Sequence, residues 1–399
     1  MATVVGGDGT FGWQAVRVVV VVCLAALAVR GLTVLTRRRR ALMMTVLGLA
    51  LIPVGVGIGL PHLAKPGSAT LTFAGLAVLA GGALLLVLGA TAIVAGIAGW
   101  WRRGPAIVAV LVACFVLTWS LGQAVAATNT PRPTVGSATP ADRGLAYRDV
   151  TFAAADGVTL SGWYVAGHNG AAVVLLHGAG STRSDVLDHA AVLARHGYAV
   201  LLYDARGRGR SEGRAMDFGW YGDQDTAGAT AFLEHQQAVD PGRIAAVGLS
   251  MGGEEAIGAA ATNGSIRAVV AEGATNGVTA DRSWLSDEFG WRGSVTQGVD
   301  ALTYGFANLL TDASPPISLH DAVRAAAPRP VLLVAASDVT DEARADRYIQ
   351  SAAPDTVELW VVPDTTHTHA LNSHPAEWEA RVISFLDHAL GIQEGSPAP

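Results

Sequence analysis

The sequence has little cysteine, a single lysine and no acidic residue in its long apolar segments. Among 399 residues there are two cysteines, Cys23 and Cys114, and both lie in apolar segments. The polar remainder of the chain therefore contains no cysteine and no disulfide. The formal net charge of -6 is modest, which argues against a nucleic-acid-binding surface.

The apolar residues are concentrated at the start of the chain. Hydrophobic residues make up 51% of the sequence and the mean hydropathy is +0.37, too high for an ordinary soluble protein of this size. We expect a transmembrane helical region over residues 1–127. Its four segments are long enough to span a bilayer: 13–35, 41–63, 71–99 and 105–127. The first spans only if Arg17 and Arg30 reach the interfaces, and an uncleaved signal-anchor is the alternative for it.

Basic residues predict the orientation of these spans. Residues 37–40 are four consecutive arginines between the first two spans, and Arg102 and Arg103 lie between the last two. Short basic loops stay in the cytoplasm, which predicts an extracytoplasmic C-terminal domain. The spans lack acidic residues and paired charges, which favours a membrane anchor over a transport path.

Beyond the spans the composition becomes that of an α/β domain. Residues 128–144 are rich in proline and threonine and predict an extended linker, and a tail covers 393–399. Between them, over 145–392, strand and helix patterns alternate, beginning with a hairpin around Asp156-Gly157. The alternation predicts a mostly parallel sheet covered on both faces, with active residues at the carboxyl ends of its strands.

A candidate nucleophile lies in the middle of this domain. Gly248-Leu249-Ser250-Met251-Gly252 follows an apolar run and precedes a stretch of small residues. The pattern is typical of a nucleophile elbow, a sharp strand-to-helix turn that exposes a serine hydroxyl. Glycine is abundant in this chain, so the pentapeptide alone occurs easily by chance. Assigning Ser250 as a nucleophile requires other catalytic motifs elsewhere in the sequence.

Those partners lead to a family. Asp156-Gly157, His177-Gly178, the segment 203–211 (YDARGRGRS) and the elbow occur in one order along the chain. In this the domain resembles the α/β-hydrolase family, specifically its serine esterase and serine aminopeptidase-like branch. The resemblance implies an α/β-hydrolase fold in which serine, acid and histidine follow one another along the chain.

The resemblance also implies the other catalytic residues. The base is His367, after the last expected strand, with His369 as its rival. His320, His374 and His388 are less well placed. The acid is Asp338, after the strand at 331–335, with Asp341 and Glu342 close enough in sequence to replace it. The loop before Asp338 departs slightly from the family, which usually has a glycine there.

The backbone N–H groups of Met251 and Ala179 are the expected oxyanion-hole donors, and His177 is expected to be structural. We expect no cofactor, because the glycines at 207, 209 and 213 lack dinucleotide-site spacing. We expect no metal either, because His367, His369 and His374 lack a zinc-site spacing.

The stretch 273–330 is long for a link between strands and contains several aromatic residues. It forms either an apolar lid over the nucleophile or extra helices packed on the core. The sequence as a whole predicts a membrane-anchored serine hydrolase that cleaves an ester, or a peptide or amide, through an acyl-enzyme. The substrate would be a small molecule, a peptide or a lipid. The alternative is a non-catalytic domain of the same fold that binds a ligand or partner.

Overall fold

The computed structural model describes residue 30 and residues 35–65 and 68–392. The first expected span, 13–35, lies outside the described residues except at Arg30 and Leu35. The chain divides into two compact units, one containing residues 1–60 and 70–122 and the other containing 61–69 and 123–399.

The described part of the first unit is made of long apolar helices, two of which, α2 and α4, end in residues of the second unit. They are α2 (Arg37–Ala64), α3 (Ala69–Ala95) and α4 (Trp100–Thr128), of 28, 27 and 29 residues. At about 1.5 Å per residue each is roughly 40 Å long, and each is long and apolar enough to cross a membrane. Among the described residues these are three such helices, which agrees with three of the four predicted spans.

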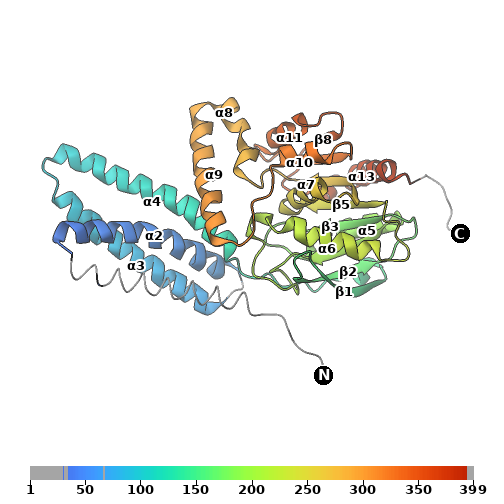
Figure 1. The fold of residues 1–399 in the computed structure, drawn as a ribbon, viewed down its shortest axis with the longest axis horizontal. Helices are drawn as coiled ribbons and strands as arrows, with labels where there is room; N and C mark the ends of the chain where they lie inside the picture. Colours follow the sequence, from blue (N-terminus) through green and yellow to red (C-terminus); the bar gives the residue numbers. More distant parts are fainter. Residues whose placement is uncertain (1–29, 31–34, 66–67, 393–399) are drawn as a thin grey trace, which may run out of the picture. The chain divides into compact units, whose positions relative to one another are not determined.

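Helices α2 and α3 run alongside each other (Figure 1), and glycines lie where they meet. A Cβ atom added to Gly55 would lie 2.4 Å from the backbone nitrogen of Leu79, and one added to Gly75 would lie 2.4 Å from that of Gly59. The two backbones therefore touch directly, as small residues permit in membrane helices.

The second unit is built on one eight-stranded sheet in the order β1-β2-β4-β3-β5-β6-β7-β8. The strands are β1 (Tyr147–Ala153), β2 (Thr159–Val165), β3 (Ala172–Leu176), β4 (Ala199–Asp204), β5 (Ile244–Leu249), β6 (Ile266–Glu272), β7 (Val331–Ala336) and β8 (Val357–Val362). β2 pairs antiparallel with both β1 and β4, and all other pairs are parallel. The mostly parallel sheet predicted from the sequence is confirmed.

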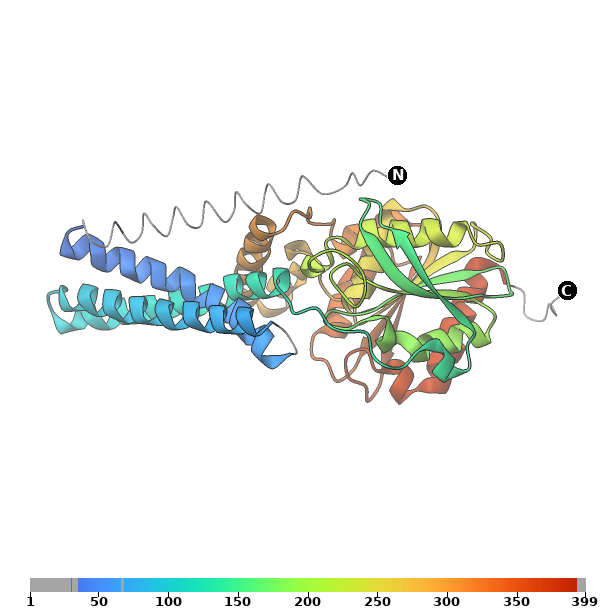
Figure 2. The ribbon, with the colours of Figure 1, turned by 90° about the horizontal axis from the view of Figure 1, so that it is seen from below.

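Two helical layers cover the sheet (Figures 1 and 2). The helices are α5 (Leu187–Arg195), α6 (Gly222–Glu234), α7 (Met251–Thr262), α10 (Leu319–Ala326), α11 (Glu342–Ser351), α12 (Ala370–Ser373) and α13 (Pro375–Leu390). Neighbouring strand residues point to opposite faces, so Val174 joins the core with α6, α7, α10 and α11. Val173 joins the core with α5 and α13. This places the carboxyl ends of the six parallel strands β3 to β8 along one edge of the sheet.

The connection from α4 to the sheet contains no helix or strand between Asn129 and Thr139. Arginines hold it against the loop that follows β4. Arg132 donates to the carbonyls of Ser211 and Gly213 at 2.5 and 2.7 Å, and Arg208 donates to Thr130 Oγ1 at 3.1 Å. These hydrogen bonds fix the segment to the domain.

The stretch 273–330 separates into two parts. Helix α10 belongs to the core beside α7, as extra core helices would. Helices α8 (Trp284–Phe289) and α9 (Trp291–Leu310) form a hairpin outside the two layers that cover the sheet (Figure 1).

Candidate active site

Ser250 occupies a strained turn between β5 and α7. Its φ and ψ are 55° and −125°, a backbone conformation that residues other than glycine rarely adopt. Its N–H donates to the Glu272 carbonyl at 2.7 Å. A Cβ added to Gly248 would lie 2.1 Å from the Gly252 carbonyl oxygen, so only glycine fits there. This is the geometry of a nucleophile elbow.

A chain of hydrogen bonds leads from this serine to a buried carboxylate. His367 Nε2 lies 2.9 Å from Ser250 Oγ, and His367 Nδ1 lies 2.5 Å from Glu342 Oε1. The other oxygen, Glu342 Oε2, accepts from the Ala336 N–H at 2.7 Å. The glutamate side chain is fully buried, whereas the histidine is 45% exposed. With the proton on Nδ1, the free Nε2 faces the serine hydroxyl and can accept its proton.

The structure corrects the expected acid. Asp338 is exposed, and its carboxylate accepts from the neighbouring Ser337 hydroxyl at 2.9 Å. Asp341 is paired with Arg344 at 3.2 Å. Glu342, an alternative weighed from the sequence, has the place beside His367 instead. Asp338 lies in the turn after β7 and is exposed to solvent. The chain comes back to the carboxyl end of β7 only at Glu342, the first residue of α11, which contacts the Ala336 N–H.

The expected base and its rivals separate clearly. His367 is brought to Ser250, as predicted, whereas His369 Nδ1 contacts the His367 carbonyl at 2.7 Å. His374 Nε2 contacts the Pro363 carbonyl at 2.8 Å. Over the described residues, no group of three or more histidine, cysteine, aspartate or glutamate side chains is arranged to hold a metal.

The end of β6 supports both members of the Ser250–His367 pair. The Glu272 carbonyl holds the serine N–H, and the Glu272 carboxylate accepts from the Ala370 N–H at 2.8 Å, just beyond the histidine loop. The next residue, Gly273, has φ +71°, and a Cβ there would lie 2.7 Å from His367 Cε1. A side chain at 273 would therefore displace the imidazole.

The two expected oxyanion donors lie at the same edge of the sheet. Met251 is the first residue of α7, whose N-terminus carries partial positive charge. Gly178 packs on the serine, since a Cβ at 178 would lie 3.3 Å from Ser250 Cβ, and Ala179 is the exposed residue that follows. The structure thus brings both segments to the serine, and their role as donors stays a prediction.

His177 is structural in its contacts. The Ala205 N–H donates to its Nε2 at 3.1 Å, so Nδ1 carries the proton and donates to the Gly178 carbonyl at 2.9 Å. Burial lowers the pKa of this histidine, which keeps it neutral. His177 thereby ties the loop beside the serine to the end of β4.

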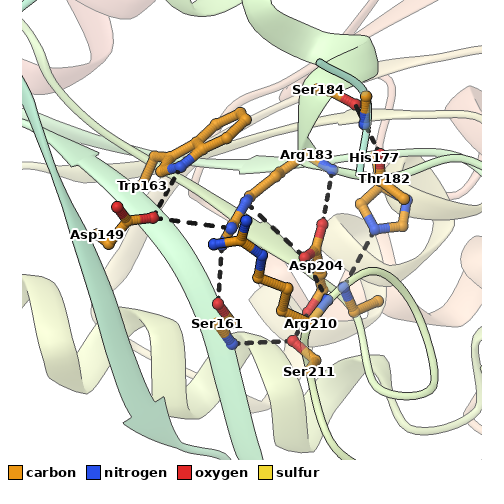
Figure 3. A network of polar contacts seen from close by, with 12 residues as sticks. Asp149, Ser161, Trp163, His177, Thr182, Arg183, Ser184, Asp204, Arg210 and Ser211 are labelled. Carbon is orange, nitrogen blue, oxygen red and sulfur yellow. Dashed lines mark hydrogen bonds and ion pairs between the residues drawn. The ribbon is translucent and has the colours of Figure 1, made fainter. Parts of the chain in front are cut away.

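A polar network fixes the loop after β4, the segment 203–211 noted in the sequence (Figure 3). The Asp204 carboxylate accepts from the backbone N–H groups of Arg183 and Arg210, each at 2.9 Å. The Arg183 guanidinium is fully buried, stacks 4.4 Å over the Trp163 ring and donates to Ser161 Oγ at 2.9 Å. A Cβ at Gly209 would lie 2.0 Å from Asp204 Oδ2. Gly209 is therefore required for the packing of this loop, and no dinucleotide-binding helix begins there.

A second buried acid lies behind Glu342. Asp346, one turn further along α11, is fully buried, and neither of its carboxylate oxygens has a hydrogen-bond partner within the described part of the chain. Burial and the nearby Glu342 raise its pKa well above the usual 3.8. Burial therefore favours the protonated, neutral form of Asp346 in the folded chain.

This acid predicts a pH-dependent cost to stability. Above pH 3.8 the unfolded chain releases the Asp346 proton while the folded chain keeps it, so wild-type stability falls as pH rises. Replacing Asp346 by asparagine removes this dependence. Relative to wild type the variant gains up to about 1.4 kcal/mol for each pH unit in that window. Thermal unfolding of both proteins at pH 5 and pH 7 measures this, and an unchanged difference would contradict it.

Comparisons with known proteins agree with this geometry. Residues 167–301 match the family model described as serine aminopeptidase, S33. An uncharacterized protein of Mycobacterium tuberculosis (strain ATCC 25618 / H37Rv), Rv2307c, is 38% identical over 133 residues. These are 33% of this chain and 45% of that protein, so the chain spans less than half the length of this relative. The uncharacterized protein YfhR of Escherichia coli O157:H7 is 25% identical over 252 residues. The match covers 61% of this chain and 82% of YfhR.

Among solved structures, an esterase of Pyrococcus furiosus, Pf2001, superposes with a TM-score of 0.54 at 26% identity. The match covers 66% of this chain and 98% of the esterase. The sheet order, the strained serine and these matches define an α/β hydrolase fold. The domain built on the eight-stranded sheet therefore has the α/β hydrolase fold, and long apolar helices that fit a membrane anchor precede it.

Proposed function

We propose that this protein is a membrane-anchored serine hydrolase that cleaves esters, or amides, through a covalent acyl-enzyme. The observation that carries the proposal is the hydrogen-bonded chain Ser250–His367–Glu342 with its serine at a strained elbow. The esterase of known structure and the serine aminopeptidase family model supply the two substrate classes.

In the proposed mechanism Ser250 Oγ attacks the substrate carbonyl while His367 Nε2 takes the hydroxyl proton. Glu342 holds the Nδ1–H tautomer and stabilises the imidazolium. The N–H groups of Met251 and Ala179 receive the oxyanion. Collapse breaks the bond to the leaving alcohol or amine, which takes the proton from His367. Water then attacks the acyl-enzyme, with His367 as base again, and releases the acid.

The test is a burst experiment on the purified full-length protein with p-nitrophenyl esters and with aminoacyl p-nitroanilides. A covalent intermediate predicts a rapid release of chromophore equal to the enzyme concentration when deacylation limits turnover. Ester turnover without amide turnover would assign an esterase, and the reverse an amidase. No hydrolysis of either series would sink the proposal and favour a non-catalytic binding domain.

We also propose that the hydrolase domain lies outside the cytoplasm. The arginines at 37–40 and the pair Arg102-Arg103 lie at the same end of the spans, opposite the end from which the domain continues. A cysteine placed at Ser137 in a cysteine-free chain should react with a membrane-impermeant maleimide in intact cells. Reaction only after lysis would reverse the orientation.

The site predicts a shifted pH profile. The hydrogen bond to Glu342 raises the pKa of His367 above its usual 6.5, and only neutral imidazole can act as base. kcat/KM should therefore fall on acidification, with a midpoint above 6.5. Replacing Glu342 by glutamine should lower that midpoint. A wild-type midpoint at or below 6.5, or a rise in the variant, would contradict the assigned role of Glu342.

A further inference from the structure

Helix α9 has a bare apolar face. Trp291, Val295, Leu302 and Leu309 are 73%, 58%, 45% and 77% exposed. At about 100° per residue, these four positions fall within about 40° of one another around the helix. Gly298 and Gly305 lie on the same stripe, and a Cβ on either would meet nothing within 4 Å. We call these six residues the α9 stripe.

The opposite face of α9 is already used for packing. Tyr304 stacks on Trp220 with ring centroids 6.2 Å apart and contacts Phe218 edge-on at 5.4 Å. Asp300 pairs with Arg282 at 3.2 Å. The helix is thus held to the domain by one side and is apolar on the other. A soluble protein would expose a polar surface there.

The two charged residues of the helix, Arg292 and Asp300, both lie off the stripe. The stripe extends over 19 residues, and its ends are roughly 27 Å apart at 1.5 Å per residue. The Arg292 guanidinium lies 5.7 Å from the centre of the Trp291 ring at one end, and the rest of the stripe carries no charge, so it is poorly suited to an acidic, basic or nucleic-acid partner. An aromatic residue at its end, Trp291, is of the kind enriched at membrane–water interfaces.

The end of α4 connects this helix to the expected membrane span. Residues from Gln123 onward belong to the same compact unit as α9. Ala124, in the last turns of α4 and inside the expected span 105–127, packs in one cluster with Ala307 of α9 and with Trp220. The C-terminal end of α9 is therefore attached to the end of a membrane-length apolar helix.

We propose that the α9 stripe lies in the interfacial layer of the bilayer, so that the domain is held to the membrane at a second place besides its spans. The inference rests on the proposed membrane anchoring. A lipid surface suits the stripe because it is continuous, apolar and indifferent to the gaps left by Gly298 and Gly305. The two attachments, α4 and α9, would fix the tilt of the hydrolase domain on the membrane.

The test uses the full chain, with Cys23 and Cys114 replaced by serine, in phosphatidylcholine vesicles. Val295→Cys and Leu302→Cys each receive a small fluorophore, and Thr296→Cys, exposed on the same helix but off the stripe, is the matched control. Brominated phosphatidylcholine should quench the two stripe probes roughly threefold more than the control. Equal quenching at all three positions would overturn the proposal.

Two further readouts distinguish lipid from protein on the stripe and test the anchor by itself. Stripe probes shielded from aqueous iodide but insensitive to brominated lipid would mean that protein covers the stripe, either a second copy or residues 13–35, and would also overturn the proposal. Washing the vesicles with alkaline carbonate tests the anchor, because an integral membrane protein stays with the lipid. Extraction of the protein by carbonate would overturn both the anchor and the α9 contact. Ester hydrolysis in the same vesicles reports the catalytic proposal separately, because it needs neither.

Discussion

Replacing His367 by alanine is expected to lower kcat by about 10⁴-fold or more. Without the imidazole, nothing 2.9 Å from Ser250 Oγ can take its proton, and a neutral hydroxyl is a poor nucleophile. KM should change little, since the histidine acts on the serine rather than on bound substrate. Steady-state hydrolysis of a p-nitrophenyl ester measures both constants.

His369 provides the matched control for this change. It lies two residues away, is exposed and contacts only the His367 carbonyl among the bonds described for its ring. His369→Ala should keep its rate within about threefold of wild type, as for a surface change near a site. A large loss in His369→Ala with an active His367→Ala would exchange the roles of the two histidines.

Replacing Glu342 by glutamine is expected to lower kcat by about 10³-fold to 10⁴-fold with little loss of stability. Glutamine keeps the size of the side chain, but its amide cannot stabilise an imidazolium, and it permits the wrong histidine tautomer. The Glu342 carboxylate is fully buried and lies 2.5 Å from His367 Nδ1, so its charge acts directly on the imidazole. Burst and steady-state rates of the purified variant give the measurement.

Asp338 is the control for Glu342. Its exposed carboxylate contacts Ser337, so Asp338→Asn should stay within about twofold of wild type. If Asp338→Asn loses activity and Glu342→Gln does not, the acid expected from the sequence is correct and the turn after β7 rearranges in the working enzyme.

The difference between these two acids shows how far the sequence could go. It placed the acid after β7, because the order of serine, acid and histidine is fixed by the fold. It favoured Asp338 over Asp341 and Glu342, and the structure places Glu342 beside His367 instead. That choice depends on how the turn from Ser337 to Asp341 returns the chain to the strand end, where the Ala336 N–H meets Glu342. The elbow was predictable because Ser250 follows the end of β5 directly, and His367 because the family resemblance places the base in the loop after β8.

Other features depend on contacts that no local pattern reveals. The proline-rich connection predicts an extended segment, but only the structure shows Arg132 and Arg208 binding it to the domain. The aromatic residues between 273 and 330 predicted either a lid or added core helices. The structure assigns α10 to the core, and it alone shows which face of α9 is left bare.

The central claim is that Ser250 is the nucleophile, and labelling with a fluorophosphonate tests it most directly. The full-length protein should take up one fluorophosphonate per chain, on the peptide that contains Ser250, and Ser250→Ala should take up none. The reagent needs an activated serine, so His367→Ala and Glu342→Gln should label much more slowly than wild type, while Asp338→Asn labels normally. Absence of labelling in wild type, or equal labelling of wild type and Ser250→Ala, would contradict the account.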